Sequence, residues 1–285
     1  MAKIENQTTL YKQNVEAIES KLVECGFPAD KKIPVWALPD AVDAALGLHK
    51  VFVVAKNDTL YTLEQIQRMT ARQITAAIPS VRGILLCAEG HRLLIAPTDA
   101  YLLDTDGNET YNLYWGGYKF STSMNKISYT IGDIEQAGRT AAMLDFDGWA
   151  KTQIMKTEIE EAGVIGPASS MEGETATHIG SAVYRAVAAY EQNSRISGGE
   201  KGWYLPAASE LTLIYRHLDE IHALIDEFNN RLGISMFERF SANSYYWSSS
   251  EGSAHFAWNV NFGYGNTSNS GKFDQYRVRA VAAFH

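Results

Sequence analysis

The sequence predicts an α+β protein of 285 residues, with helices in the middle of the chain and β-structure at its end. Apolar residues recur at helical spacing from about Ala208 to Leu232, and after Gly233 that spacing gives way to alternation. Hydrophobic residues make up 46% of the chain and charged residues 20%, which is enough apolar material for one sizeable core.

The first 48 residues predict a helical region that precedes the main domain. Its apolar side chains are spaced four, three, four and three residues apart, as at coiled-coil core positions. Three prolines between Pro28 and Pro39 end the pattern. The run is shorter than three heptads, so two interpretations stay open: a helix packed on its own domain, or a segment for oligomerisation or attachment. The residues concerned are Tyr11, Val15, Ile18, Leu22 and Cys25.

Residues 49–285 predict the main domain, which begins with two β-hairpins. Residues 50–62 hold a β-branched run, an Asn-Asp turn and a second short run, and residues 80–97 repeat this order. Between the hairpins, Thr62 and Gln65 form the pattern of a capping box that opens a short helix over residues 63–73.

Two longer helices and a β-rich end follow. Residues 176–192 and 208–232 predict the helices, because their apolar side chains fall on one face. Residues 257–262 predict a half-buried strand with Trp258, Val260 and Phe262 facing the core. Residues 276–284 predict another strand, and the Gly, Ser and Asn content of residues 263–275 predicts a loop between the two.

Charge and hydropathy exclude several classes of partner. The chain has 25 basic and 33 acidic residues, so its net charge of −8 argues against nucleic acid and anionic membranes as partners. It has no run of 18 apolar residues, so we expect no membrane insertion. The first residues carry no signal-peptide pattern, so we expect no export by the usual route.

Catalytic and metal-binding patterns are missing from the sequence. The seven histidines show no H-x-x-x-H spacing, and we interpret His217 and His222 as surface or packing residues. Asp145 and Asp147 predict a tight turn, because the ligands of a calcium loop do not follow them. Cys25 and Cys87 predict buried thiols. We therefore expect no enzyme activity, no cofactor and no metal.

The segment from Ser241 to Tyr276 has the most unusual composition. Its 36 residues include nine aromatic residues, eight serines, five asparagines and four glycines. The aromatic fraction of this segment is more than twice that of the whole chain. Aromatic side chains supply rigid contact area, and Ser, Gly and Asn supply adaptable hydrogen bonds, a mixture typical of antibody paratopes. The alternative is a loop-rich core filler. We expect Trp247, Trp258 and Phe262 to be core residues, and Tyr264, Phe273 and Tyr276 to be less buried.

Five motifs carry a resemblance to a known family. They are DFDGWAKT (145–152), KGWYLPAASEL (201–211), YYWSSSE (245–251), AWNVNF (257–262) and RVRAVAAF (277–284). In this order they resemble C-type-lectin-fold domains of the formylglycine-generating-enzyme type. More narrowly, the chain is similar to the variable proteins of diversity-generating retroelements of bacteria and their phages. The resemblance implies a C-type-lectin-like ligand-binding domain over residues 49–285. With no signal-peptide pattern, it also implies a place on a phage particle, or in the bacterial cytoplasm before assembly.

The resemblance also implies a variable region at about residues 241–276. In those proteins adenines of Asn-type codons change, which yields residues such as Asn, Tyr, Ser, Asp, His, Phe and Gly. Asn243 could be a further member, whereas Gln275 does not follow from an Asn codon. The candidate ligand-binding positions are Tyr245, Ser253, His255, Phe256, Gly263, Tyr264, Asn266, Ser268, Asn269, Ser270, Phe273, Asp274 and Tyr276.

Two departures from related families bear on function. Both cysteines lie upstream of the C-terminal half, so the oxidase activity of formylglycine-generating enzymes is not expected. The calcium-dependent sugar motifs of animal C-type lectins are absent as well. The sequence thus predicts a non-enzymatic recognition protein whose partner is a protein or a cell-surface glycan. The alternative is a structural or adhesin subunit whose C-terminal face is a fixed assembly interface.

Overall fold

The computed structural model describes residues 51–104, 106–163 and 180–284. The predicted N-terminal helix and residues 176–179 lie outside the described residues. The helices are α3 (Leu63–Arg68), α4 (Ala71–Ala77), α5 (Glu135–Ala142), α6 (Gly148–Ile154), the π-helix η2 (Met155–Glu160), α7 (Ala182–Ser194), α8 (Ala208–Arg216) and α9 (Leu218–Leu232). The strands are β1 (Val51–Ala55), β2 (Leu60–Tyr61), β3 (Val81–Ala88), β4 (His91–Ile95), β5 (Leu102–Leu103), β6 (Glu109–Thr110), β7 (Leu113–Tyr114), β8 (Tyr245–Glu251), β9 (Phe256–Asn261), β10 (Thr267–Gly271), β11 (Gln275–Tyr276) and β12 (Val281–Ala283).

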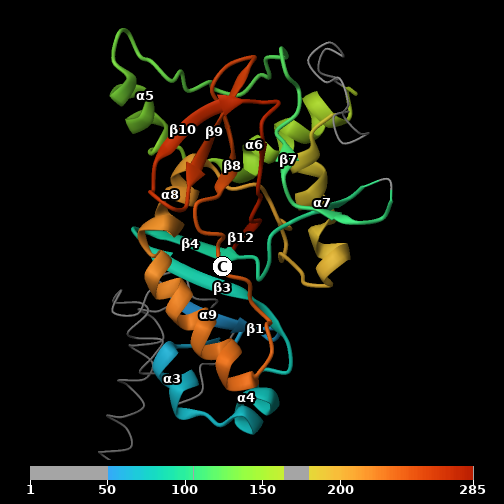
Figure 1. Cartoon of the computed structure of the whole chain (residues 1–285), viewed down its shortest axis with the longest axis vertical. Helices are drawn as coiled ribbons and strands as arrows, with labels where there is room; N and C mark the ends of the chain where they lie inside the picture. The colour runs from blue at the N-terminus through green and yellow to red at the C-terminus, as the bar shows by residue number, and fades with distance from the viewer. Residues whose placement is uncertain (1–50, 105, 164–179, 285) are drawn as a thin grey trace, which may run out of the picture.

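A five-stranded antiparallel sheet forms the middle of the molecule, in the order β12-β4-β3-β1-β2 (Figure 1). The predicted hairpins are confirmed as β1–β2 and β3–β4. Strand β12 pairs with β4, with Val281 opposite Ile95. Residues 281–283 therefore form one edge of the sheet that also contains β1. This mixture of helices and sheets confirms the α+β class.

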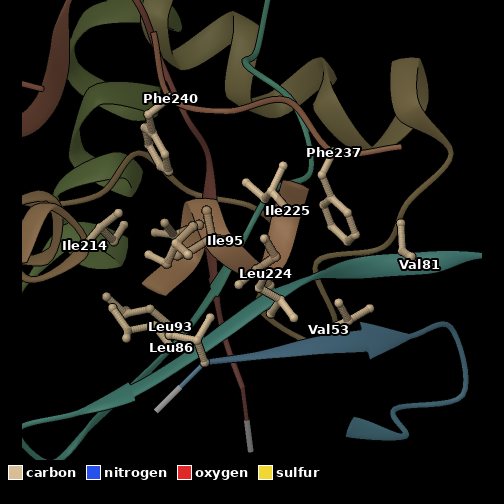
Figure 2. Close-up of a cluster of buried hydrophobic side chains, with 14 of the residues drawn as sticks. Val53, Val81, Leu86, Leu93, Ile95, Ile214, Leu224, Ile225, Phe237 and Phe240 are labelled. Carbon is tan, nitrogen blue, oxygen red and sulfur yellow. The ribbon is translucent and has the colours of Figure 1, made fainter. Parts of the chain in front are cut away.

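Helices cover both faces of this sheet. On one face α9 lies across the strands, and its Leu224 and Ile225 pack with Val53 and Leu86 (Figure 2). The opposite face buries the alternate side chains, including Phe52 and Leu85, against α7. Because a sheet covered on both sides has apolar residues at every position, β1 is buried along its whole length.

Two predicted helices are broken in the structure. Met69 is extended and Thr70 caps α4 with a second capping box, so residues 63–73 form two short helices. The predicted helix 208–232 breaks at His217, whose N–H donates to Ile214 O at 3.1 Å. Helix α8 packs against β8 and β9, whereas α9 packs against β1. Because of the break, the apolar side chains of residues 208–232 pack against two different sheets.

The second sheet has the order β10-β9-β8 and lies beyond the first, at the top of Figure 1. The prediction of a loop over residues 263–275 is wrong, because Thr267–Gly271 pair with β9 as strand β10. Ser, Asn and Gly are poor strand formers, but pairing with an existing strand outweighs that preference.

The strand predictions at the end of the chain also need correction. Strand β9 is buried on both faces, since Asn259 and Asn261 are 0% and 2% exposed. The predicted strand 276–284 is confined to its two ends: Tyr276 ends β11, which pairs with β7 in a two-stranded sheet, and Val281–Ala283 form β12 of the five-stranded sheet, so residues 277–280 connect these two sheets. The buried Arg279 donates to Asp99 Oδ1 at 2.6 Å during this crossing. No helix in the described part of the chain is long and apolar enough to span a membrane.

Candidate ligand-binding surface

The thirteen candidate positions all reach the surface. Seven are exposed, namely Tyr245, His255, Phe256, Gly263, Tyr264, Asn266 and Phe273, and six are half-buried, namely Ser253, Ser268, Asn269, Ser270, Asp274 and Tyr276. We call these thirteen residues the candidate surface. Between them, Trp247, Trp258 and Phe262 are at most 3% exposed, which confirms their expected place in the core.

One end of the β9–β10 hairpin carries an aromatic cluster. Phe256 opens β9 opposite Gly271, and Phe273 follows two residues later. The ring of Tyr118 lies edge-on to both His255 and Phe273, with ring centroids 5.3 Å and 4.9 Å apart. Phe256 and Phe273 are 47% and 41% exposed. We call Tyr118, His255, Phe256 and Phe273 the aromatic cluster.

The other side of the candidate surface is more polar. Tyr245 and Tyr276 stack with ring centroids 4.9 Å apart, and Tyr276 also packs on the buried Trp247. The Tyr276 hydroxyl lies 3.2 Å from Ser270 Oγ. Tyr264 stands in the turn after β9 and is 72% exposed. This side therefore offers hydroxyl groups together with ring surface.

A buried ion pair fixes the loop that carries Phe273. Lys272 Nζ donates to Glu251 Oε1 at 2.5 Å, and both side chains are fully buried. The ammonium also donates to Phe120 O at 2.9 Å and lies 4.6 Å from the centre of the Trp115 ring. Burial lowers the pKa of Lys272, while the Glu251 carboxylate raises it. The ion pair between Lys272 and Glu251 thus fixes both side chains, and with them the start of the loop that carries Phe273.

Polar side chains also fix the strands beneath the candidate surface. The indole N–H groups of Trp247 and Trp258 donate to Leu113 O at 2.8 Å and Ile127 O at 2.7 Å. Ser248 Oγ donates to Trp258 O at 2.7 Å. Asn261 Oδ1 accepts the N–H groups of Gly263 and Tyr264, which holds the turn that presents Tyr264.

The structure gives the contacts of several residues considered for catalysis or metal binding. His222 Nε2 accepts the N–H of Phe240 at 3.1 Å, and burial lowers the pKa of His222 to about 4. Asp145 bonds with Lys151 and Ser250. Cys87 is half-buried rather than buried, and Cys25 lies outside the described residues. Within the described ranges, no group of three His, Cys, Asp or Glu side chains could hold a metal ion.

Sequence reasoning missed a buried carboxyl beneath the second sheet. Glu210 is 4% exposed, and its carboxyl accepts the Ala207 N–H at 2.7 Å and the Tyr204 hydroxyl at 3.0 Å. Burial raises the pKa of Glu210 to about 8. The only signal was the capping-box position of Glu210, three residues after Ala207.

Sequence reasoning also missed Tyr118, which lies more than 130 positions before His255. The stretch WGGYKFST, residues 115–122, mixes aromatic residues with Gly, Ser and Thr in the way the C-terminal segment does. That shared composition was the available signal.

The comparisons with known proteins bear on the second half of the chain. Residues 141–282 match the Lcl C-terminal domain. The match to the Lcl C-terminal domain supports a lectin-like domain with a ligand-binding or adhesin-like role. It contains all thirteen residues of the candidate surface and leaves out Tyr118.

Further comparisons give little beyond the Lcl C-terminal domain. No curated protein matches the chain. A crystal structure of a fimbrial protein from Bacteroides ovatus ATCC 8483 aligns at 11% sequence identity with a TM-score of 0.43, covering 68% of this chain and 36% of that chain. The chain therefore spans little more than a third of the length of that fimbrial protein.

Proposed function

We propose that the protein is a non-enzymatic recognition protein, a C-type-lectin-fold variable protein of a diversity-generating retroelement, whose candidate surface binds a protein or a cell-surface glycan. One observation carries the proposal: the thirteen positions named from the resemblance all reach the surface, while most residues between them form a buried, hydrogen-bonded scaffold, with Ala254, Gly265 and Gln275 as the exceptions. Buried positions would have made diversification incompatible with folding.

The chemistry of the candidate surface suits binding. Large aromatic side chains contribute much of the binding free energy at interfaces, and Tyr264 and Phe256 are exposed instead of packed in the core. The hydroxyl and amide groups of Ser268, Asn266 and Tyr276 add hydrogen-bonding capacity.

One position fits diversification poorly. An added Cβ at Gly263 would overlap the side-chain oxygen of Asn243 and lie 3.0 Å from its Cα. Asn243 has a φ of 60° and cannot move without changing the turn before β8. We therefore expect Gly263 to vary least among the thirteen.

Sequencing the gene from independent isolates of one population tests the proposal. Substitutions concentrated at the thirteen positions, with scaffold codons unchanged, are the expected result. A near-repeat of the gene's variable region with Asn codons and a reverse-transcriptase gene, both next to this gene, would further support diversification. Substitutions spread evenly along the gene would contradict diversification and favour the second candidate, a structural or adhesin subunit with a fixed interface.

A further inference from the structure

The loop from Trp115 to Thr122 is anchored at its base by buried contacts. The Trp115 indole N–H donates to Ser248 O at 2.8 Å, and Ser181 Oγ donates to Trp115 O at 2.8 Å. Gly116 has a φ of 91°, and a Cβ there would overlap the carbonyl oxygen of Gly180. The loop is thus held against β8 and the start of α7.

The far end of the loop is tied to the same ion pair that fixes Phe273. Thr122 Oγ1 donates to Glu251 Oε2 at 2.6 Å, and Phe120 O accepts Lys272 Nζ. The next residue, Ser123, donates its N–H to Glu158 Oε2 at 2.7 Å. Because Glu251 and Lys272 bond to the loop and to each other, they fix Tyr118 relative to Phe273.

Two side chains at the tip of the loop border the aromatic cluster. Tyr118 touches His255 and Phe273 through its ring, as described above. Lys119 has a φ of 67° and is exposed, with its ammonium 5.7 Å from the centre of the Tyr118 ring. Among the described residues, no ion pair includes Lys119. Lys119 is thus an exposed cation outside the ion pairs of the described residues, on a chain with a net charge of −8.

We infer that Tyr118 and Lys119 are ligand contacts at a constant position beside the variable residues, and that they select a protein ligand with an apolar side chain next to a carboxylate. The inference rests on the proposed function. Within the aromatic cluster, Phe256 and Phe273 offer exposed ring surface without hydrogen-bonding groups, which suits an apolar protein side chain. The exposed ammonium of Lys119, which joins no ion pair in the described part of the chain, suits the carboxylate.

A random dodecapeptide library displayed on filamentous phage provides the probe. Panning against the full chain is expected to enrich peptides that carry an aromatic or aliphatic residue close to Asp or Glu. Synthetic copies of these peptides are then titrated against the variants by fluorescence polarisation. Tyr118→Ala and Phe273→Ala are each expected to weaken binding at least tenfold. Tyr118→Phe, which keeps the ring, is expected to retain binding.

A second aromatic–lysine pair supplies the matched control. Trp149 is 38% exposed, and Lys201 lies 5.1 Å from the centre of its ring. None of the ring contacts or hydrogen bonds described for Trp149 joins it to the candidate surface. Trp149→Ala is therefore expected to leave peptide binding unchanged.

Lys119→Glu tests the charge without removing a packed ring. Panning against this variant is expected to replace Asp and Glu in the enriched peptides by Lys and Arg. An unchanged preference, or no enrichment of any peptide on the unmodified protein, would overturn the inference, as would binding confined to a glycan array. Loss of binding at Phe273 but not at Tyr118 would overturn it as well, and would leave the proposed function standing.

Discussion

The five-stranded and the three-stranded sheet are buried to a similar extent but by different means. The five-stranded sheet is held by apolar side chains on both faces, such as Val53 and Leu85. The three-stranded sheet buries serines, asparagines and a charged pair, including Asn259, Glu251 and Lys272. Apolar packing tolerates exchange of similar side chains, whereas a buried polar network functions only in one geometry.

The difference explains how one sheet can display a changing surface. Hydrogen bonds with defined partners fix the backbone positions from which Phe256, Tyr264 and Phe273 project. The projecting side chains contribute few of those bonds. Buried polar groups thus determine the backbone position of each ligand contact. The type of the exposed side chain determines which ligand it can bind.

Truncating the largest core side chain of the three-stranded sheet should have the largest effect. Trp258 is fully buried and packs with Ala142 and Ala208. Trp258→Ala removes this packing and the indole hydrogen bond, so we expect the free energy of unfolding to fall by about 3–5 kcal/mol in urea denaturation. Tyr264→Ala is the control and should change it by less than about 0.5 kcal/mol. Similar losses for both would show that the aromatic residues of this segment all belong to the core.

Breaking the buried ion pair should have the next largest effect. Lys272→Met removes the buried ammonium that bonds to the Glu251 carboxylate and leaves only the longer contact to Lys126, at 3.7 Å, so we expect a loss of about 3 kcal/mol in the same measurement. Adding Glu251→Gln should restore part of that stability, because it removes a buried charge whose close partner is gone. Strictly additive losses would argue that the two side chains do not act as a pair.

Glu210 makes the stability of the second sheet depend on pH. The pKa of Glu210 is raised from about 4.5 to about 8 in the folded protein. The folded state therefore binds more protons than the unfolded state within this window, and the contribution to stability falls by about 1.4 kcal/mol per unit as pH rises. Glu210→Gln should remove that slope, measured by urea denaturation between pH 5 and 8. Glu200→Gln, at an exposed position, should leave the slope unchanged.

Much of the fold could be predicted because its signals are local. Alternation and turn residues predicted both hairpins of the five-stranded sheet, and Thr62 with Gln65 predicted the first capping box. Strand β10 was missed because its residues become a strand only through pairing with β9. The break at His217 was missed for a similar reason, since two different sheets divide one continuous apolar run.

The aromatic cluster was predicted only in part. The thirteen residues of the candidate surface stand close together in the sequence, so composition marked their segment and the resemblance named the positions. Tyr118 reaches the cluster through ring contacts with His255 and Phe273, which lie more than 130 residues away in the sequence, and no local pattern predicts such contacts. The partners of Lys272 and Glu251 could not be predicted either, although these are two of only three charged residues in the segment from Ser241 to Tyr276.

The smallest effect on stability should come from the surface itself. A combined exchange of Phe256, Tyr264, Asn266 and Phe273 for mixed residues removes side chains that are exposed and carry no buried hydrogen bond in the described structure. We expect the thermal midpoint to stay almost unchanged, because surface substitutions away from the core cost little. Peptide or glycan binding should fall more than tenfold if these residues are central contacts. Gly263→Tyr supplies the contrast: it is equally exposed, but its Cβ meets Asn243, so it should lower the midpoint by several degrees. If the combined exchange unfolds the domain as Trp258→Ala does, these rings stabilise the fold and the assembly-subunit alternative gains.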